Sequence, residues 1–115
     1  MAAKPGSGDV VWLDFTPTRG HEQSGRRPAL VISPKRYNEK SGLALVCPIT
    51  TSVHGYPFEV PVTDAVDGVI LVDQVRTVDW RARGLTKAGT VPIETLTHVR
   101  ALLHLLIDPD TAENR

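Results

Sequence analysis

The feature of this 115-residue sequence that most restricts its fold is a series of short β-strand segments, each bounded by glycine or proline. Valine, isoleucine, threonine and aromatic residues favour strands, whereas glycine and proline interrupt them. The pattern predicts strands at 9–15, 28–33, 43–49, 58–62 and 69–75, the last continuing past a bulge through 76–80. Several short strands favour a small closed or half-closed antiparallel barrel, because closure removes the exposed edges of a sheet.

Two of these predicted strands contain a proline whose place in the sheet can be inferred, since proline donates no backbone hydrogen bond. Pro28 is expected at the beginning of its strand, and Pro61 is expected in an edge strand at 58–62, where apolar and polar residues alternate. Residues 35–42 resemble a polar turn or a single helical turn, and 84–89 resemble a basic loop. These connections are short, as in a compact domain.

The one long helical pattern lies near the C-terminal end. Pro92 suits the first helical position, and Glu94 suits the positive N-terminal end of the helix. The apolar residues that follow have the spacing of a helix packed on a sheet by one face: Ile93, Leu96, Val99, Leu103 and Leu106. Pro109 is expected to end the helix.

The length leaves room for one domain, since folded domains commonly contain about 100 to 150 residues. We expect a flexible tail at 1–7, one domain at 8–108 and a frayed tail at 109–115. No segment approaches the roughly 20 apolar residues that span a bilayer, and the N-terminal residues contain no hydrophobic signal region. A cytoplasmic location without membrane contact is therefore expected.

Charge and cysteine content exclude several function classes. The 13 basic and 13 acidic residues give a formal net charge of zero, so bulk charge is not expected to drive nucleic-acid binding. Basic residues still gather at 19–36 and 76–87, where they suit phosphate binding or are simply scattered solvated charge. The single cysteine, Cys47, is interpreted as a small buried hydrophobe. Histidines 54, 98 and 104 lack a ligand-like grouping, so no metal site is predicted.

The most informative segment is the long loop between the first two predicted strands. It contains an imidazole at His21, a carboxylate at Glu22 and guanidinium groups at Arg26 and Arg27. This mixture suits chemistry on RNA, which carries its own nucleophile, the 2′-hydroxyl. An enzyme then needs only to deprotonate this hydroxyl, stabilise the anionic phosphorus centre and protonate the departing 5′-oxygen. Neither a cofactor nor a metal is required.

Ordered motifs along the chain make the sequence similar to a known family. They are GDVVW (8–12), DFTP (14–17), GHEQ (20–23), RP (27–28), PITT (48–51), GYPFEV (55–60), DQVR (73–76) and WRARG (80–84). In these motifs the sequence resembles the MazF toxins and their plasmid relatives PemK and Kid, over about residues 8–107. The resemblance implies a mostly β fold, a small SH3-like antiparallel barrel of the PemK/CcdB type with a C-terminal helix.

The same resemblance implies an activity and partners. It implies the toxin of a type II toxin–antitoxin system, a metal-independent and sequence-specific endoribonuclease that cleaves single-stranded mRNA and inhibits translation and growth. The products would carry 2′,3′-cyclic phosphate and 5′-hydroxyl ends. A homodimer is implied, together with a labile MazE-like antitoxin whose acidic, flexible segment lies across the RNA groove.

Carried over to this sequence, the resemblance implies that Arg27 and Thr50 are catalytic and that Glu22 supports them. Arginine can bind two phosphate oxygens through its planar fork and stays charged at any working pH, and threonine offers a hydroxyl donor. The alternatives are a surface arginine paired with Glu22 and an ordinary threonine at a strand end. For Thr50, the residues alone favour the ordinary interpretation.

The proton transfers need another group, because an arginine with a pKa above about 12 is a poor acid or base near neutrality. His21 matches a histidine found in some plasmid relatives, so either His21 or Glu22 is expected to accept the 2′-hydroxyl proton. Those relatives also have an arginine where this chain has Leu71, two residues before Asp73. This departure favours the scheme with Arg27 and Thr50.

Other residues are candidates for RNA binding. Asp73, Gln74 and Arg83 are expected beside the cleft, where they would contact base edges or the backbone of single-stranded RNA. Trp12 and Trp80 would either stack on bases or belong to the core.

Two other function classes remain to be separated from the nuclease. One is a CcdB-like toxin of the same fold class, which binds DNA gyrase and cleaves nothing. The other is a regulatory SH3-like module whose loop recognises a peptide. The set formed by Glu22, Arg27 and Thr50 favours the nuclease over both.

Overall fold

The structure is a computed structural model that describes residues 4–15 and 25–108. His21 and Glu22 of the predicted catalytic loop lie outside the described residues, as does the predicted tail at 109–115. Residues 4–7 contact the rest of the chain: the Gly6 N–H donates to the Asp9 carboxylate at 2.8 Å, and the Ser7 hydroxyl donates to the Ile32 carbonyl at 3.2 Å. No helix in the described part is long and apolar enough to cross a membrane.

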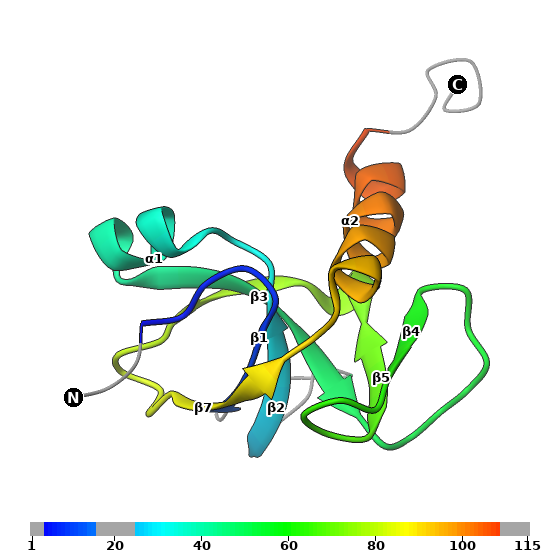
Figure 1. Ribbon diagram of the computed structural model, residues 1–115, viewed down its shortest axis with the longest axis horizontal. Helices are drawn as coiled ribbons and strands as arrows, with labels where there is room; N and C mark the ends of the chain where they lie inside the picture. The colour runs from blue at the N-terminus through cyan, green and yellow to red at the C-terminus, as the bar shows by residue number, and fades with distance from the viewer. Residues whose placement is uncertain (1–3, 16–24, 109–115) are drawn as a thin grey trace.

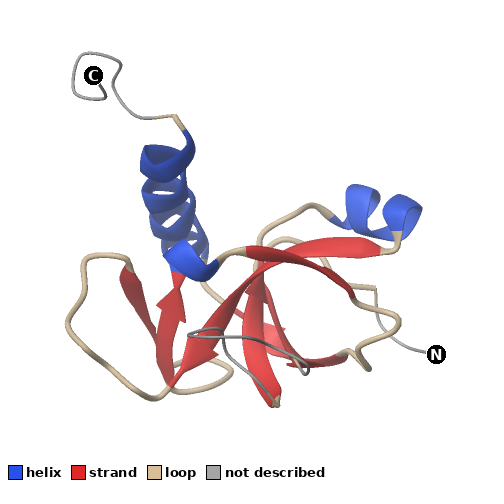
Figure 2. Cartoon of the chain, turned by 180° about the vertical axis from the view of Figure 1, so that it is seen from behind, coloured by secondary structure: helices blue, strands red, loops and turns tan. Residues whose placement is uncertain are grey.

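In the described part of the chain, seven strands form one antiparallel, strongly curled sheet. They are β1 (Asp9–Asp14), β2 (Arg26–Val31), β3 (Leu43–Thr50), β4 (Glu59–Val62), β5 (Gly68–Leu71), β6 (Arg76–Asp79) and β7 (Thr86–Thr90). Their order is β4-β5-β3-β2-β1-β7, and β6 pairs with β3 outside this path. Figure 1 and the reverse view in Figure 2 show the sheet bending into a half-barrel. The predicted half-closed antiparallel barrel with a C-terminal helix is confirmed.

Strand β3 holds the two halves of the sheet together. Its first half pairs with β6, its middle pairs with β2, and its last residues, Ile49 and Thr50, pair with Ile70 and Val69 of β5. The strand therefore changes partners just before it ends. Thr50 lies at this change, close to both β2 and β5.

Alternate residues of the central strands supply two separate cores, as the two-residue period of a strand requires. On one face Val10, Leu30 and Cys47 pack with Leu96 and Val99 of the C-terminal helix. On the other face Val11, Ala29 and Val46 pack with other buried side chains: Leu13, Phe15, Val31, Ala44, Val78 and Trp80. Trp80 is thus a core residue, whereas Trp12 is 36% exposed.

Within residues 4–15 and 25–108, two α-helices flank the sheet. Helix α1 (Lys35–Ser41) lies at the end of the sheet opposite β4 and β5, and it ends at Gly42, whose φ of 74° is easily reached only without a side chain. Helix α2 (Ile93–Ile107) stands over the sheet beside β4 and β5 (Figure 1). Pro92, expected at the first helical position, is its N-cap, so the helix begins one residue later than the sequence predicts, which is a usual difference at helix ends.

The prediction that a strand begins at Pro28 is wrong by two residues. Strand β2 begins at Arg26, so Pro28 lies inside it, opposite Trp12 of β1. The ladder between β2 and β3 covers only residues 29–31 of β2, so Pro28 lies outside that ladder and does not interrupt it. As a result Arg26 and Arg27 belong to a strand instead of to the preceding loop.

Two further predicted elements are wrong. The apolar segment 69–75 is a strand only to Leu71, because its pairing with β4 ends there, and η1 (Val72–Gln74) is a 3₁₀ helix. The sequence predicts a basic loop at 84–89, but residues 86–90 form β7, which pairs with the free side of β1. The sequence of β7, TKAGT, contains few residues that favour strands, so backbone pairing with β1 outweighs its local preference.

Candidate functional site

Arg27 and Thr50 lie on neighbouring strands at one end of the sheet. The register between β2 and β3 pairs Ala29 with Pro48, and continuing it by two residues places Arg27 opposite Thr50. Both side chains line a cavity of about 330 Å³, named here the arginine cavity, together with Trp12, Arg26, Pro28, Ile49, Thr51, Val66 and Asp67. The structure thus brings together the two residues that the sequence separates by 23 positions.

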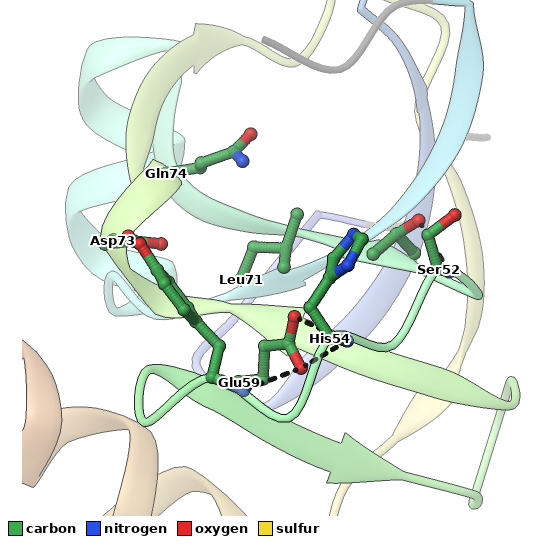
Figure 3. Close-up of a pocket in the computed structure, with 8 residues that line it drawn as sticks. Ser52, His54, Glu59, Leu71, Asp73 and Gln74 are labelled. Carbon is green, nitrogen blue, oxygen red and sulfur yellow. Dashed lines mark hydrogen bonds between the residues drawn. The ribbon is translucent and has the colours of Figure 1, made fainter. Parts of the chain in front are cut away.

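A second cavity of about 380 Å³, named here the Asp73 cavity, lies on the other side of Thr50. It is lined by Thr50, Ser52, His54, Tyr56, Glu59, Leu71, Asp73 and Gln74. Figure 3 shows Leu71 between Asp73 and Gln74 on one side and His54 on the other. Asp73 and Gln74 reach this position because β5 stops at Leu71 and the chain turns through η1.

Thr50 borders both cavities and is 7% exposed. Its Oγ1 accepts a hydrogen bond from the Ser52 N–H at 3.1 Å. A hydroxyl that accepts one bond can still donate its own hydrogen. The side chain is therefore held in place by the chain that follows it, while its O–H can serve as a donor to a bound group.

The segment 52–57 forms a wall of the Asp73 cavity, and two contacts of its residues fix it. The Glu59 carboxylate accepts hydrogen bonds from the backbone N–H groups of His54, Gly55 and Tyr56. The Tyr56 hydroxyl donates to the Asp73 carboxylate at 3.1 Å. This hydrogen bond and the negative charge of Asp73 raise the pKa of the Tyr56 phenol, so the phenol remains protonated near neutrality.

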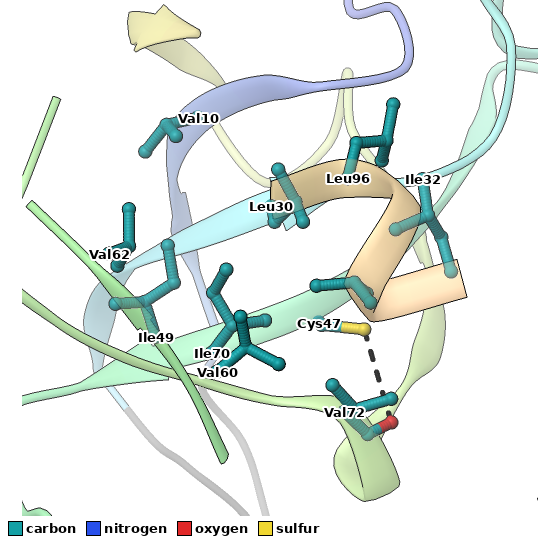
Figure 4. Close-up of a cluster of buried hydrophobic side chains, with 11 residues drawn as sticks. Val10, Leu30, Ile32, Cys47, Ile49, Val60, Val62, Ile70, Val72 and Leu96 are labelled. Atoms are coloured by element: carbon teal, nitrogen blue, oxygen red, sulfur yellow. Dashed lines mark hydrogen bonds between the residues drawn. The ribbon is translucent and has the colours of Figure 1, made fainter. Parts of the chain in front are cut away.

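Cys47 lies behind the Asp73 cavity but does not line it. Its side chain is fully buried, and its Sγ contacts the Val72 carbonyl oxygen (Figure 4). Burial, and secondly the negative charge of Asp73, raise the pKa of this thiol from 9.0 to about 12. A thiol that stays neutral is a poor nucleophile, so the interpretation of Cys47 as a buried hydrophobe is confirmed.

The described residues on either side of 16–24, the segment that contains His21 and Glu22, lie beside the arginine cavity. The Phe15 N–H donates to the Gly25 carbonyl at 2.8 Å, which joins the two ends. The Arg26 guanidinium donates to the Gly84 carbonyl at 2.9 Å and to the Thr86 hydroxyl at 2.8 Å. Since Arg27 follows Arg26, both chain ends lie near the catalytic candidates.

Arg83 occupies a different place from the other candidates for RNA binding. It donates to the Asp14 carbonyl at 2.9 Å and lines a separate cavity of about 290 Å³, beside Asp79. It belongs to neither cavity that Thr50 borders. The structure therefore brings Asp73 and Gln74 to Thr50, and it places Arg83 at the base of the loop between β1 and β2.

Several residues of the site received no role from the sequence, among them His54, Tyr56 and Glu59. One available signal was a glutamate that begins a strand four residues after Gly55, because carboxylates often accept bonds from nearby backbone N–H groups in turns. Within 4–15 and 25–108, no group of three or more histidine, cysteine or acidic side chains is arranged to hold a metal ion.

Comparison with known proteins gives consistent matches over almost the whole chain. Residues 7–107 match the family profile described as the PemK-like, MazF-like toxin of type II toxin–antitoxin systems. The endoribonuclease toxin MazF of Escherichia coli strain K12 is 52% identical over 104 residues, which cover 90% of this chain and 94% of that protein.

Solved structures agree with the sequence comparison. The crystal structure of MazF (Form-I) from Deinococcus radiodurans matches with a TM-score of 0.87 and 47% identity, covering 91% of this chain and 97% of that one. The structure of MazE–MazF (Form-II) from the same organism matches with a TM-score of 0.84 and 45% identity, covering 94% and 99%.

Proposed function

Because the chain belongs to the PemK-like, MazF-like family of type II toxins, we propose that it acts as an endoribonuclease that cleaves single-stranded RNA between Arg27 and Thr50. The proposed catalytic domain spans residues 8–108. The cleavage needs no metal and uses the 2′-hydroxyl of the substrate as the nucleophile. The toxin thereby destroys mRNA and inhibits translation.

The observation that carries this proposal is the meeting of Arg27 and Thr50 in the arginine cavity. A guanidinium on β2 and a hydroxyl on β3 face the same space from neighbouring strands, so their separation is set by the sheet and not by a loop. Groups held on a rigid scaffold stabilise a transition state without first having to reorganise.

In the proposed reaction the scissile phosphate lies in the arginine cavity. The 2′-oxygen attacks phosphorus and loses its proton to His21 or Glu22. The guanidinium of Arg27 and the hydroxyl of Thr50 donate to the nonbridging oxygens, whose negative charge grows in the transition state. The bond from phosphorus to the 5′-oxygen breaks, this oxygen takes up a proton, and the products end in 2′,3′-cyclic phosphate and 5′-hydroxyl.

The Asp73 cavity is proposed to hold a base next to the scissile phosphate. Its carboxylate at Asp73 only accepts hydrogen bonds, whereas the Gln74 amide both donates and accepts, so together they can distinguish base edges. Leu71, where the plasmid relatives have arginine, is 6% exposed and adds no charge to this cavity. Arg83 is proposed to contact the RNA backbone farther along, at the base of the loop.

The partner and the assembly are part of the same proposal. The solved MazE–MazF complexes from D. radiodurans contain a toxin of this fold with its antitoxin. We propose a MazE-like antitoxin that covers the arginine cavity with an acidic segment, a homodimer of the toxin, and the cytoplasm as its location.

Cleavage of a long mixed-sequence RNA in the presence of EDTA tests the proposal. The protein should cut at a small number of sites, and mapping the 5′ ends of the fragments reports the recognised bases. Arg27→Ala should lower the rate by about 10²–10³-fold, the usual effect of removing one donor to a charged transition state. Arg36→Ala, which removes an exposed arginine on α1, is the matched control and should cut like the wild type.

Two results would contradict the proposal. Intact RNA after incubation with the wild type would eliminate the nuclease and leave a CcdB-like toxin or an SH3-like binding module. Equal cleavage of an all-deoxy oligonucleotide would remove the 2′-hydroxyl from the mechanism.

A further inference from the structure

A single carboxylate, that of Glu59, organises the wall of the Asp73 cavity. Its Oε1 accepts from the N–H groups of His54 at 3.1 Å, Gly55 at 3.0 Å and Tyr56 at 3.4 Å, and its Oε2 accepts from His54 at 3.2 Å. Figure 3 shows the bonds from His54 and Tyr56 to Glu59 as dashed lines. Hydrogen bonds to an ionised acceptor are roughly twice as strong as bonds between neutral groups.

The wall has little else to hold it in this shape. Residues 51–57 are all exposed, so apolar packing contributes little to their position. Gly55 has a φ of 70°, which turns three successive N–H groups toward one point. The Tyr56 hydroxyl then reaches Asp73 at 3.1 Å and links the wall to η1 on the opposite side of the cavity.

Glu59 itself stands on a well-fixed element. It is the first residue of β4 and pairs with Leu71 of β5, and the Val72 N–H donates to the Phe58 carbonyl at 3.0 Å. The carboxylate thus anchors the exposed segment 54–56 to a paired strand of the sheet by hydrogen bonds. Because three N–H groups satisfy it, its negative charge is also partly neutralised beside a cavity that would receive RNA.

We propose that Glu59 is a positioning residue that preforms the Asp73 cavity for RNA by holding segment 52–57 in place. This inference rests on the proposed function and adds a residue to it. Glu59 contacts neither the scissile phosphate nor a base; it acts through the wall. Its loss lowers the fraction of molecules in which the cavity is formed.

The expected effect falls on substrate binding. If only one molecule in ten keeps the wall in place, the apparent affinity for RNA falls about tenfold, because binding requires the formed cavity. Arg27 and Thr50 are held by β2 and β3, and the Glu59 bonds fix residues 54–56, beyond the Ser52 N–H that contacts Thr50, so kcat at saturating RNA should change by less than about threefold.

Steady-state cleavage of a short RNA that contains one mapped site, combined with amide hydrogen exchange, tests this inference. Glu59→Ala should raise KM about tenfold and speed exchange at His54, Gly55 and Tyr56. Glu59→Gln keeps one accepting oxygen and nearly the same shape, so it should have an intermediate KM and a wild-type melting temperature. Glu39→Gln on α1 removes a comparable carboxylate and should leave KM and exchange unchanged.

The outcomes separate this inference from the proposed function. If the wild type cuts RNA and Glu59→Ala keeps the wild-type KM, the inference is overturned, as it also is if exchange at the three amides does not change. A fall in kcat without a change in KM would overturn it too, because that pattern belongs to a group acting in the transition state. If the wild type does not cut RNA at all, the proposed function has failed, and the exchange data alone report whether Glu59 holds the wall.

Discussion

Replacing Thr50 with valine is the sharpest test of the catalytic geometry, because it removes a hydroxyl and keeps nearly the same shape. Thr50 is 7% exposed at the end of β3, so the added methyl group occupies space that the side chain already fills. The one hydrogen bond lost in the resting protein is the 3.1 Å bond from the Ser52 N–H. Ser52 is exposed, so water can replace the lost acceptor, and the free energy of unfolding should change by no more than about 1 kcal/mol.

The effect on catalysis should be much larger than the effect on stability. A donor that meets developing negative charge in the transition state is worth about 10²–10³-fold in kcat, or roughly 3–4 kcal/mol. Thr50→Val should therefore lower kcat by this factor with little change in KM, whereas Thr50→Ser, which keeps the hydroxyl, should stay within about tenfold of the wild type. Steady-state cleavage of a short RNA measures kcat and KM, and thermal denaturation checks the fold. A Thr50→Val variant that cuts at the wild-type rate would refute the assignment of Thr50 as a donor.

Two further predictions concern the fold around the site. Asn38→Ala should lower the free energy of unfolding by about 2–4 kcal/mol, because the fully buried amide hydrogen-bonds to the Ser33 hydroxyl at 2.6 Å and to the Pro5 and Ser33 carbonyls. Urea denaturation at fixed protein concentration measures this loss. A loss below 0.5 kcal/mol, about that of a surface substitution, would contradict the prediction. For Cys47, the thiol has a pKa of about 12 in the folded protein and 9.0 in the unfolded protein. Its contribution to the free energy of unfolding is therefore fully present below pH 9 and is lost as pH rises toward 12. From pH 8 to pH 10 the wild type should lose about 1.4 kcal/mol more than Cys47→Ala, and equal losses would show that burial does not raise this pKa.

The parts of the fold that the sequence predicts are those where local pattern and tertiary pairing agree. Strand β1 and helix α2 combine a clear period with turn residues at their ends, and both lie within a residue of the predicted bounds. Segment 86–90 has no such pattern, and only the free side of β1 makes it a strand. Segment 69–75 has the composition of a strand throughout, but the partner strand β4 ends opposite Leu71. Strand ends thus depend on partners that are distant in the sequence.

The candidate site likewise contains residues that local motifs predict and residues whose place depends on distant parts of the chain. Arg27 and Thr50 are found through motifs, and the structure supplies the reason that they belong together, since β2 and β3 are neighbours. Glu59 also lies in a motif, GYPFEV (55–60), but the motif does not reveal its role, because that role depends on three backbone N–H groups and not on side chains. Arg83 has the right chemistry for RNA, but its contact with the Asp14 carbonyl places it at the loop base, which no local pattern reveals.

The position of Thr50 between two cavities follows from how closely β5 approaches the end of β3. Gly68 begins β5 with a φ of 154°, and a Cβ atom there would collide with the Thr50 carbonyl oxygen. Only glycine allows β5 to pair at this point, and this pairing places β5 beside the last two residues of β3. The arginine cavity therefore lies on the β2 side of Thr50, and the Asp73 cavity lies on the β5 side. A phosphate beside Arg27 and a base beside Asp73 would be adjacent parts of one RNA strand, so the position of Thr50 at the end of β3, where it lines both cavities, would couple the place of cleavage to the identity of the neighbouring base.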